Sequence, residues 1–192
     1  MTVLEPIRDA CPTVGGCENR TMTSAFRPLA AALLLATVTA AHAVEPLVQH
    51  DIVLLQKGDL IEQRVDGGAD AMSAYLKTLG AALTETMRAN PSQLPTAGFV
   101  VVAIRPGNQT HTWFDFKPAL ADKTMAALTQ TVAATPTMPV KSGDIVFALR
   151  VSVWSDKPPL AYAPKPQAWT DATKDMHPKP DVDTLVDMVW PR

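Results

Sequence analysis

The order of apolar and polar positions predicts a small sheet built from the middle of the chain. The segment 98–105 is apolar on both of its faces, which is typical of an interior strand. The segment 143–154 places large apolar side chains at alternate positions, as a strand with one buried face does. Between them, 110–116 also alternates, and the preceding turn 106–108 contains Gly and Asn, which tolerate the backbone of a tight hairpin. These segments predict three strands of one antiparallel sheet.

Two other stretches change to helical spacing. In 71–89 the apolar residues recur at intervals of three and four, which gives one apolar stripe. A second helix is expected over 118–133, where Pro118 suits the first turn. Upstream, the short apolar runs 51–56 and 60–65 flank a glycine-containing turn and predict a hairpin. The predicted fold class is α+β, a small antiparallel sheet with two helices packed on one face.

The residues before position 44 predict export from the cytoplasm. Arg27 precedes a short apolar run over 28–38, and Ala41 and Ala43 supply the small residues of a signal-peptide cleavage site. The run is too short to favour a membrane-spanning helix. We therefore expect residues 1–43 to be leader and signal peptide, cleaved after Ala43, with no stable membrane span afterwards. An uncleaved anchor is the alternative.

Residues 1–21 fit poorly as part of this signal. They carry three acidic and two basic side chains, whereas the start of a signal peptide is net positive. Translation from Met22 is the hypothesis that explains them, and a genuine leader is the alternative. Cys11 and Cys17 both lie in this segment. An exported chain without them has no thiol for a disulfide or a cysteine-bound metal.

Composition divides the remaining chain into a domain over 44–156 and a tail over 157–192. The 192 residues carry a formal net charge of -2, which gives no bias toward nucleic acid. Many of the 17 prolines fall in the tail, where they favour extended chain. The tail also contains Trp169 and Trp190, which are too apolar for a simple linker. Two hypotheses follow: a tail packed across the domain, or an arm that docks on a partner.

The order of the predicted helices and strands resembles the C-terminal domain of the TonB and TolA energy-transducing periplasmic proteins. The matching features are Gly98 at the start of an apolar strand, the turn 106–108, the helical segment Ala126–Leu128, Pro139–Val140, and Gly143 before the last strand. The resemblance implies a periplasmic domain that binds proteins by adding a strand to its sheet. It does not imply the motor function of that family, because no membrane-anchored half or long spacer is predicted.

One cluster of side chains suggests a binding site. His111, Trp113 and Asp115 share a face of one predicted strand, while Arg150 and Trp154 share a face of the last. If the helices cover the opposite face, these five lie together on open sheet. Trp and Arg are enriched where interfaces concentrate binding energy. The alternative is that the tail covers this face and the cluster is a second small core.

Recognisable catalytic motifs are absent from the sequence, and the histidines that follow the signal, His50, His111 and His177, have no ligand-like spacing. We therefore expect no cofactor and no metal site. The predicted function is an exported, periplasmic, non-catalytic domain that binds an envelope protein, and a homodimer formed by strand pairing is a further hypothesis. The alternatives are an envelope hydrolase with an unrecognised active site and a small-ligand carrier.

Overall fold

The computed structural model describes residues 44–91 and 94–191. The predictions for the leader, the signal peptide and its cleavage site at Ala41 and Ala43 lie outside the described residues.

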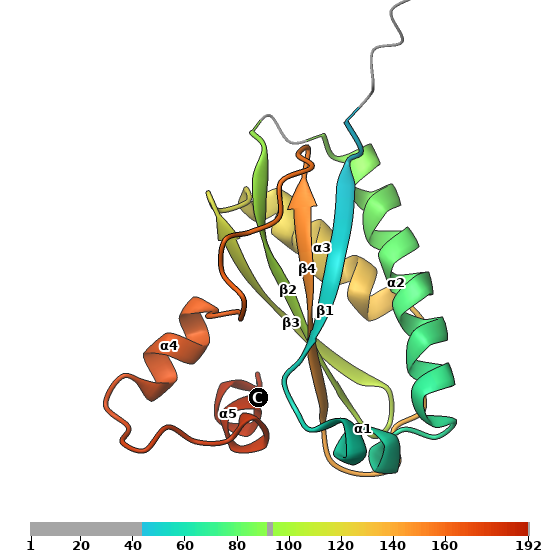
Figure 1. Ribbon diagram of the computed structural model, residues 1–192, viewed down its shortest axis with the longest axis vertical. Helices are drawn as coiled ribbons and strands as arrows, with labels where there is room; N and C mark the ends of the chain where they lie inside the picture. Colours follow the sequence, from blue (N-terminus) through green and yellow to red (C-terminus); the bar gives the residue numbers. More distant parts are fainter. Residues whose placement is uncertain (1–43, 92–93, 192) are drawn as a thin grey trace, which may run out of the picture. The chain divides into compact units, whose positions relative to one another are not determined.

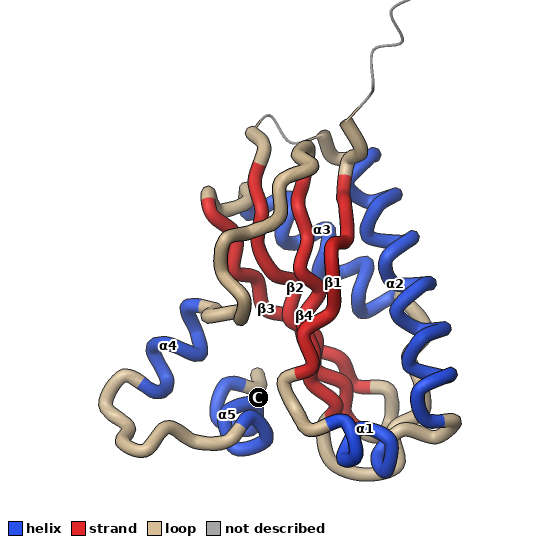
Figure 2. The backbone as a smooth tube through the Cα atoms, viewed as in Figure 1, coloured by secondary structure: helices blue, strands red, loops and turns tan. Residues whose placement is uncertain are grey.

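Within the described chain, four strands form one open antiparallel sheet in the order β1-β4-β2-β3 (Figures 1 and 2). The strands are β1 Leu47–Leu54, β2 Thr96–Arg105, β3 Gln109–Lys117 and β4 Ile145–Val153. The predicted strands 98–105, 110–116 and 143–154 are confirmed to within two residues at each end. β2 and β4 are the interior strands and are buried along almost their whole length. β1 and β3 are the edges.

Two helices cover one face of this sheet (Figure 1). α2, Gly68–Ala89, buries Leu79, Leu83 and Met87, which belong to the predicted apolar stripe. α3, Asp122–Ala134, starts four residues later than predicted. Pro118 does not open it, because the chain stays extended through Ala121 and the Pro118 carbonyl accepts a hydrogen bond from the Thr96 hydroxyl. The mixed α/β class and the antiparallel sheet are confirmed.

The hairpin predicted for 51–56 and 60–65 is wrong. The first run belongs to β1, which begins upstream at Leu47 and pairs with β4. The second run forms α1, Gly58–Arg64. Ile61 and the residue after the helix, Val65, are four positions apart and both buried, so helical spacing turns them toward the same side.

The tail, described over residues 157–191, covers the face of the sheet away from α2 and α3. It contains two short helices, α4 Gln167–Thr173 and α5 Val182–Val189. Trp169 and Val186 enter a second apolar cluster with Phe99, Val101 and Trp113 of the sheet. This arrangement agrees with the hypothesis of a packed tail. It also explains why β4, expected to be half-buried, is buried on both faces.

Charged side chains fix α5 to α1 and to the end of β2. Arg64 donates to both carboxylate oxygens of Asp183, at 3.0 and 2.7 Å, and this hydrogen bond lowers the pKa of Asp183. Arg105 donates to both oxygens of Asp144 at 3.0 and 3.1 Å, while its guanidinium carbon lies 3.9 Å from the centre of the Trp190 ring. Planar two-point pairs of this kind define orientation as well as adding attraction.

Candidate functional site

Aromatic side chains of the tail pack on two of the five residues predicted to bind a partner, His111 and Trp113. Trp113 is 7% exposed, and its ring centroid lies 5.5 Å from that of Trp169 and 6.5 Å from that of Trp190. The ring of His111 lies 4.5 Å from Trp113 and 5.7 Å from Trp190, and burial lowers the pKa of His111. These aromatic contacts are those of a second core.

Asp115 and Arg150 lie beneath other parts of the tail. Asp115 accepts a hydrogen bond from the backbone N–H of Lys165 at 2.7 Å. Arg150 donates to Asp51 on β1 at 3.0 Å and to the carbonyl of Pro159. Asp115 therefore holds the tail, and Arg150 holds both the tail and β1, so both side chains are engaged within the chain.

Trp154 does not share the face of Arg150, so that part of the prediction is wrong. The strand ends at Val153, and Trp154 has a φ of 52°, in the left-handed region. That backbone turns the side chain against the core on the α2 and α3 side. The alternation that placed it with Arg150 holds only while the strand continues.

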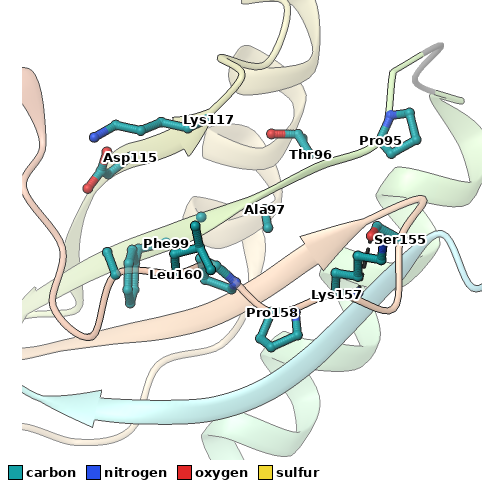
Figure 3. Close-up of a pocket in the computed structure, with 13 residues that line it drawn as sticks. Pro95, Thr96, Ala97, Phe99, Asp115, Lys117, Ser155, Lys157, Pro158 and Leu160 are labelled. Atoms are coloured by element: carbon teal, nitrogen blue, oxygen red, sulfur yellow. Dashed lines mark hydrogen bonds between the residues drawn. The ribbon is translucent and has the colours of Figure 1, made fainter.

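A pocket of about 510 Å³ lies where residues 155–161 pass over the ends of β2 and β3 (Figure 3). Phe99 and Leu160 supply apolar surface, while Asp115, Lys117 and Lys157 supply charge. The volume is within the usual range for small-molecule sites.

Three polar side chains of this pocket form hydrogen bonds within the chain itself. Asp115 accepts from Lys165, Thr96 donates to Pro118, and the Ser155 hydroxyl oxygen accepts the Lys157 backbone N–H at 3.1 Å. Among the residues that line the pocket there is no histidine. The lining therefore does not pair a hydroxyl nucleophile with an adjacent imidazole base, as triad-type catalysis requires.

A second concave region, the edge groove, lies between β1 and α2 and has a volume of about 700 Å³. Its β1 wall includes Ile52, which is 37% exposed, and Leu54, which is 47% exposed. Its α2 wall includes Met72 and Leu76. Figure 1 shows β1 at the border of the sheet beside α2. In the described chain β1 pairs only with β4, so its outer backbone edge is left open next to an apolar surface.

The edge groove was not identified from the sequence. Ile52 and Leu54 alternate in the run that was assigned to a hairpin, and apolar alternation is the same for a buried strand face and an exposed one. Which strand becomes the edge depends on the long-range pairing of β1 with β4, residues about a hundred positions apart in the chain.

The described residues, 44–91 and 94–191, contain neither a metal-binding cluster nor a membrane-spanning helix. No group of three or more His, Cys, Asp or Glu side chains among them is arranged to hold a metal ion. No helix among them is both long and apolar enough to cross a membrane.

Comparison of the whole chain with protein-family models, with curated proteins and with solved structures gives no match in any of the three. The resemblance to the TonB and TolA C-terminal domains therefore remains a prediction from the sequence.

Proposed function

We propose that the domain is a non-catalytic protein-binding module that works in the cell envelope and binds its partner along the outer edge of β1. One observation carries the proposal: an eight-residue edge strand with exposed Ile52 and Leu54 borders an apolar groove. A sheet edge offers a row of backbone donors and acceptors, and a groove beside it offers pockets for the side chains of an added strand.

The energetics favour a strand from a protein as the occupant. Each backbone hydrogen bond contributes a net of about 0.5–1.5 kcal/mol when it forms in the interface. Burying the exposed parts of Ile52 and Leu54 adds roughly 25 cal/mol for each Å² of apolar surface removed from water. These two contributions come together only if the ligand is an extended peptide that lies along β1 and points alternate side chains into the edge groove.

The place of action rests on the leader. The apolar run 28–38 followed by Ala41 and Ala43 supports a secretory signal, and with it a periplasmic location. The resemblance to the TonB and TolA domains supports strand addition as the mode of binding. The proposal includes no force transmission, because the resemblance covers the globular domain alone.

The test is photo-crosslinking in the native cell. A photoreactive amino acid replaces Ile52 in one strain and Leu160 in a second, because Leu160 is 96% exposed and lies in the tail. We expect a protein adduct of defined mass from position 52 and none from position 160. Absence of an adduct at 52, or the same adduct from both positions, contradicts the proposal. Cell fractionation tests the compartment independently.

A further inference from the structure

The register of β1 against β4 contains an irregularity that bears on the identity of the partner. Gln49 lies opposite Val151 and Asp51 lies opposite Arg150, so His50 is an extra residue in β1. Such a β-bulge inserts one residue and shifts the alternation of side chains after it. As a result, the side chains that face the helices stand at odd positions before His50 and at even positions after it.

The pairing with β4 assigns each β1 residue to a face. On the side of α2 and α3 lie Leu47, Gln49, Ile52 and Leu54, because their β4 partners Val153, Val151, Leu149 and Phe147 belong to that core. On the side of the tail lie Val48, Asp51 and Val53, because they are paired with Ser152, Arg150 and Ala148. The His50 imidazole also points to that side, where its Nε2 lies 2.9 Å from the Ser152 hydroxyl oxygen.

With the bulge counted, β1 is complementary to a second copy of itself. Consider two β1 strands run antiparallel about a two-fold axis between His50 and Asp51. Leu47 then lies opposite Leu54 of the second copy, and Gln49 lies opposite Ile52, all on the helix side. On the tail side Val48 lies opposite Val53 of the second copy. Without the bulge these pairs would combine residues from opposite faces, which direct cross-strand neighbours do not allow.

The polar side chains at the centre of the strand are also complementary. His50 of each copy lies opposite Asp51 of the other, and opposite charges or a hydrogen bond at directly opposed positions stabilise a sheet. The Ser152 hydroxyl donates its proton to the Ser155 carbonyl, so the His50 Nε2–H is the donor to Ser152 and Nδ1 is left for another partner. On Asp51, Oδ2 accepts from Arg150, and within the described chain Oδ1 has no hydrogen bond.

The bulge also selects against other strands. A bulged edge disfavours pairing with a regular strand, which is one way in which proteins protect their edges. A second copy brings the same extra residue to the same place, so the two irregularities oppose each other at the axis. In this arrangement the two edge grooves would meet as well, because in each copy Ile52 and Leu54 line the groove together with residues of α2.

We propose that the partner that binds along β1 is a second copy of this chain, paired antiparallel about an axis between His50 and Asp51, so that two four-stranded sheets become one. The inference rests on the proposed function and identifies the protein that the edge groove binds.

The first test is the molecular mass in solution. It is measured by sedimentation equilibrium on the protein as purified from its cells. We expect a concentration-dependent dimer. Ile52→Lys should weaken the dimer at least about tenfold, because it places an ammonium among apolar side chains at the interface. Leu160→Lys, which adds the same charge at a tail position that is 96% exposed, should leave it unchanged. A dimer that Ile52→Lys does not weaken overturns the inference, since its interface lies elsewhere.

The second test uses the predicted charge pairs. His50→Asp places two carboxylates opposite each other at each pair, and Asp51→Lys places an ammonium opposite each imidazole, so each variant alone should dimerise at least about fivefold more weakly. Mixed together, the two variants restore an opposite-charge or hydrogen-bonding pair at both positions and should form a heterodimer. This rescue separates a broken interface from a damaged fold, and its absence contradicts the β1 register.

The outcomes distinguish the two proposals. A chain that stays monomeric while position 52 crosslinks to a different protein overturns the self-pairing and leaves the protein-binding function standing. A monomeric chain with no adduct from position 52 overturns both. An adduct of twice the chain mass from position 52, together with heterodimer formation by the charge variants, supports both.

Discussion

The molecule has two apolar surfaces beside its helix-covered core, and they differ in whether the chain itself covers them. The tail face, formed by Phe99, Val101 and Trp113, is covered by residues of the same chain. The edge groove beside Ile52 and Leu54 is left exposed, with an open strand edge next to it. Under the proposed function, this difference directs binding to the edge groove. The comparison also shows why aromatic residues alone do not identify an interface.

The two surfaces also differ in the kinds of side chain that form them. The tail face contains large aromatic rings in edge-to-face contact, anchored by Arg105 and Arg64 at its rim. The edge groove has medium-sized aliphatic side chains and unpaired backbone, with few charges. Substitutions on the tail face should therefore change stability, whereas substitutions in the edge groove should change binding.

Trp113→Ala should have the largest effect on stability. It removes a ring that is 7% exposed and packs on Trp169, so it leaves a cavity that the tail cannot fill. We expect a loss of about 3–5 kcal/mol in the free energy of unfolding, measured by urea titration. Tyr162→Ala, at a site 84% exposed, is the control and should cost far less. Equal stability of Trp113→Ala and the unsubstituted protein would mean that the tail face is not a core.

Arg105→Ala should have the next largest effect. It removes the partner of Asp144, a residue that is 9% exposed and whose pKa is already raised by burial. Breaking a fully buried pair costs several kcal/mol, and because Arg105 is partly exposed we expect about 2 kcal/mol. α5 should loosen as well, so limited proteolysis should cut sooner between α4 and α5. Arg88→Ala, in an exposed pair on α2, should do neither.

His111 gives the tail face a pH dependence. Burial lowers its pKa in the folded protein, so as the pH falls the unfolded chain takes up the proton first. The stability from this residue is complete above about pH 6.5 and is lost as the pH falls below that value toward the lowered pKa. The urea concentration at the midpoint of unfolding should therefore decrease as the pH is lowered from 7.5 to 5.5. The substitution His111→Gln should make this decrease smaller. If the urea midpoint of the variant falls just as steeply with decreasing pH, another titratable group causes the pH dependence.

Leu54→Ser should have the smallest effect on stability and a large effect on binding. The side chain is 47% exposed and lines the edge groove, so its loss should change the free energy of unfolding by only about 0.5 kcal/mol. Crosslinking from position 52 should nevertheless fall, because an apolar contact of the bound strand is missing. A destabilisation as large as that of Trp113→Ala would show that the groove is part of the core.

The parts of the fold that depend on neighbouring residues could be predicted from the sequence. The strands 98–105 and 110–116 and the helix 71–89 are set by local alternation, helical spacing and the turn 106–108, and the structure contains all of them. The predictions are wrong where contacts between residues far apart in the chain determine the local structure. Residues 60–65 became α1 because Ile61 and Val65 pack on the core, and Trp154 changed face because the strand ends before it.

The candidate site was harder to predict for the same reason. His111 and Trp113 have the composition of an interface, and only the distant tail, with Trp169 and Trp190, makes them interior. The open edge at β1 results from a pairing with β4 that no local pattern specifies. The bulge at His50 could not be foreseen either, because it is defined by the register of two strands and has no sequence signal of its own.

Amide hydrogen exchange along β1, followed residue by residue by NMR, tests the central claim most directly. The measurement compares dilute protein with protein at a concentration where the proposed partner, a second copy, should be bound. We expect the outward-facing amides of residues 47–54 to exchange slowly only in the bound state, while those of β3, the other edge, do not change. Unchanged exchange along β1, with new protection elsewhere on the surface, would contradict the claim that this edge binds the partner.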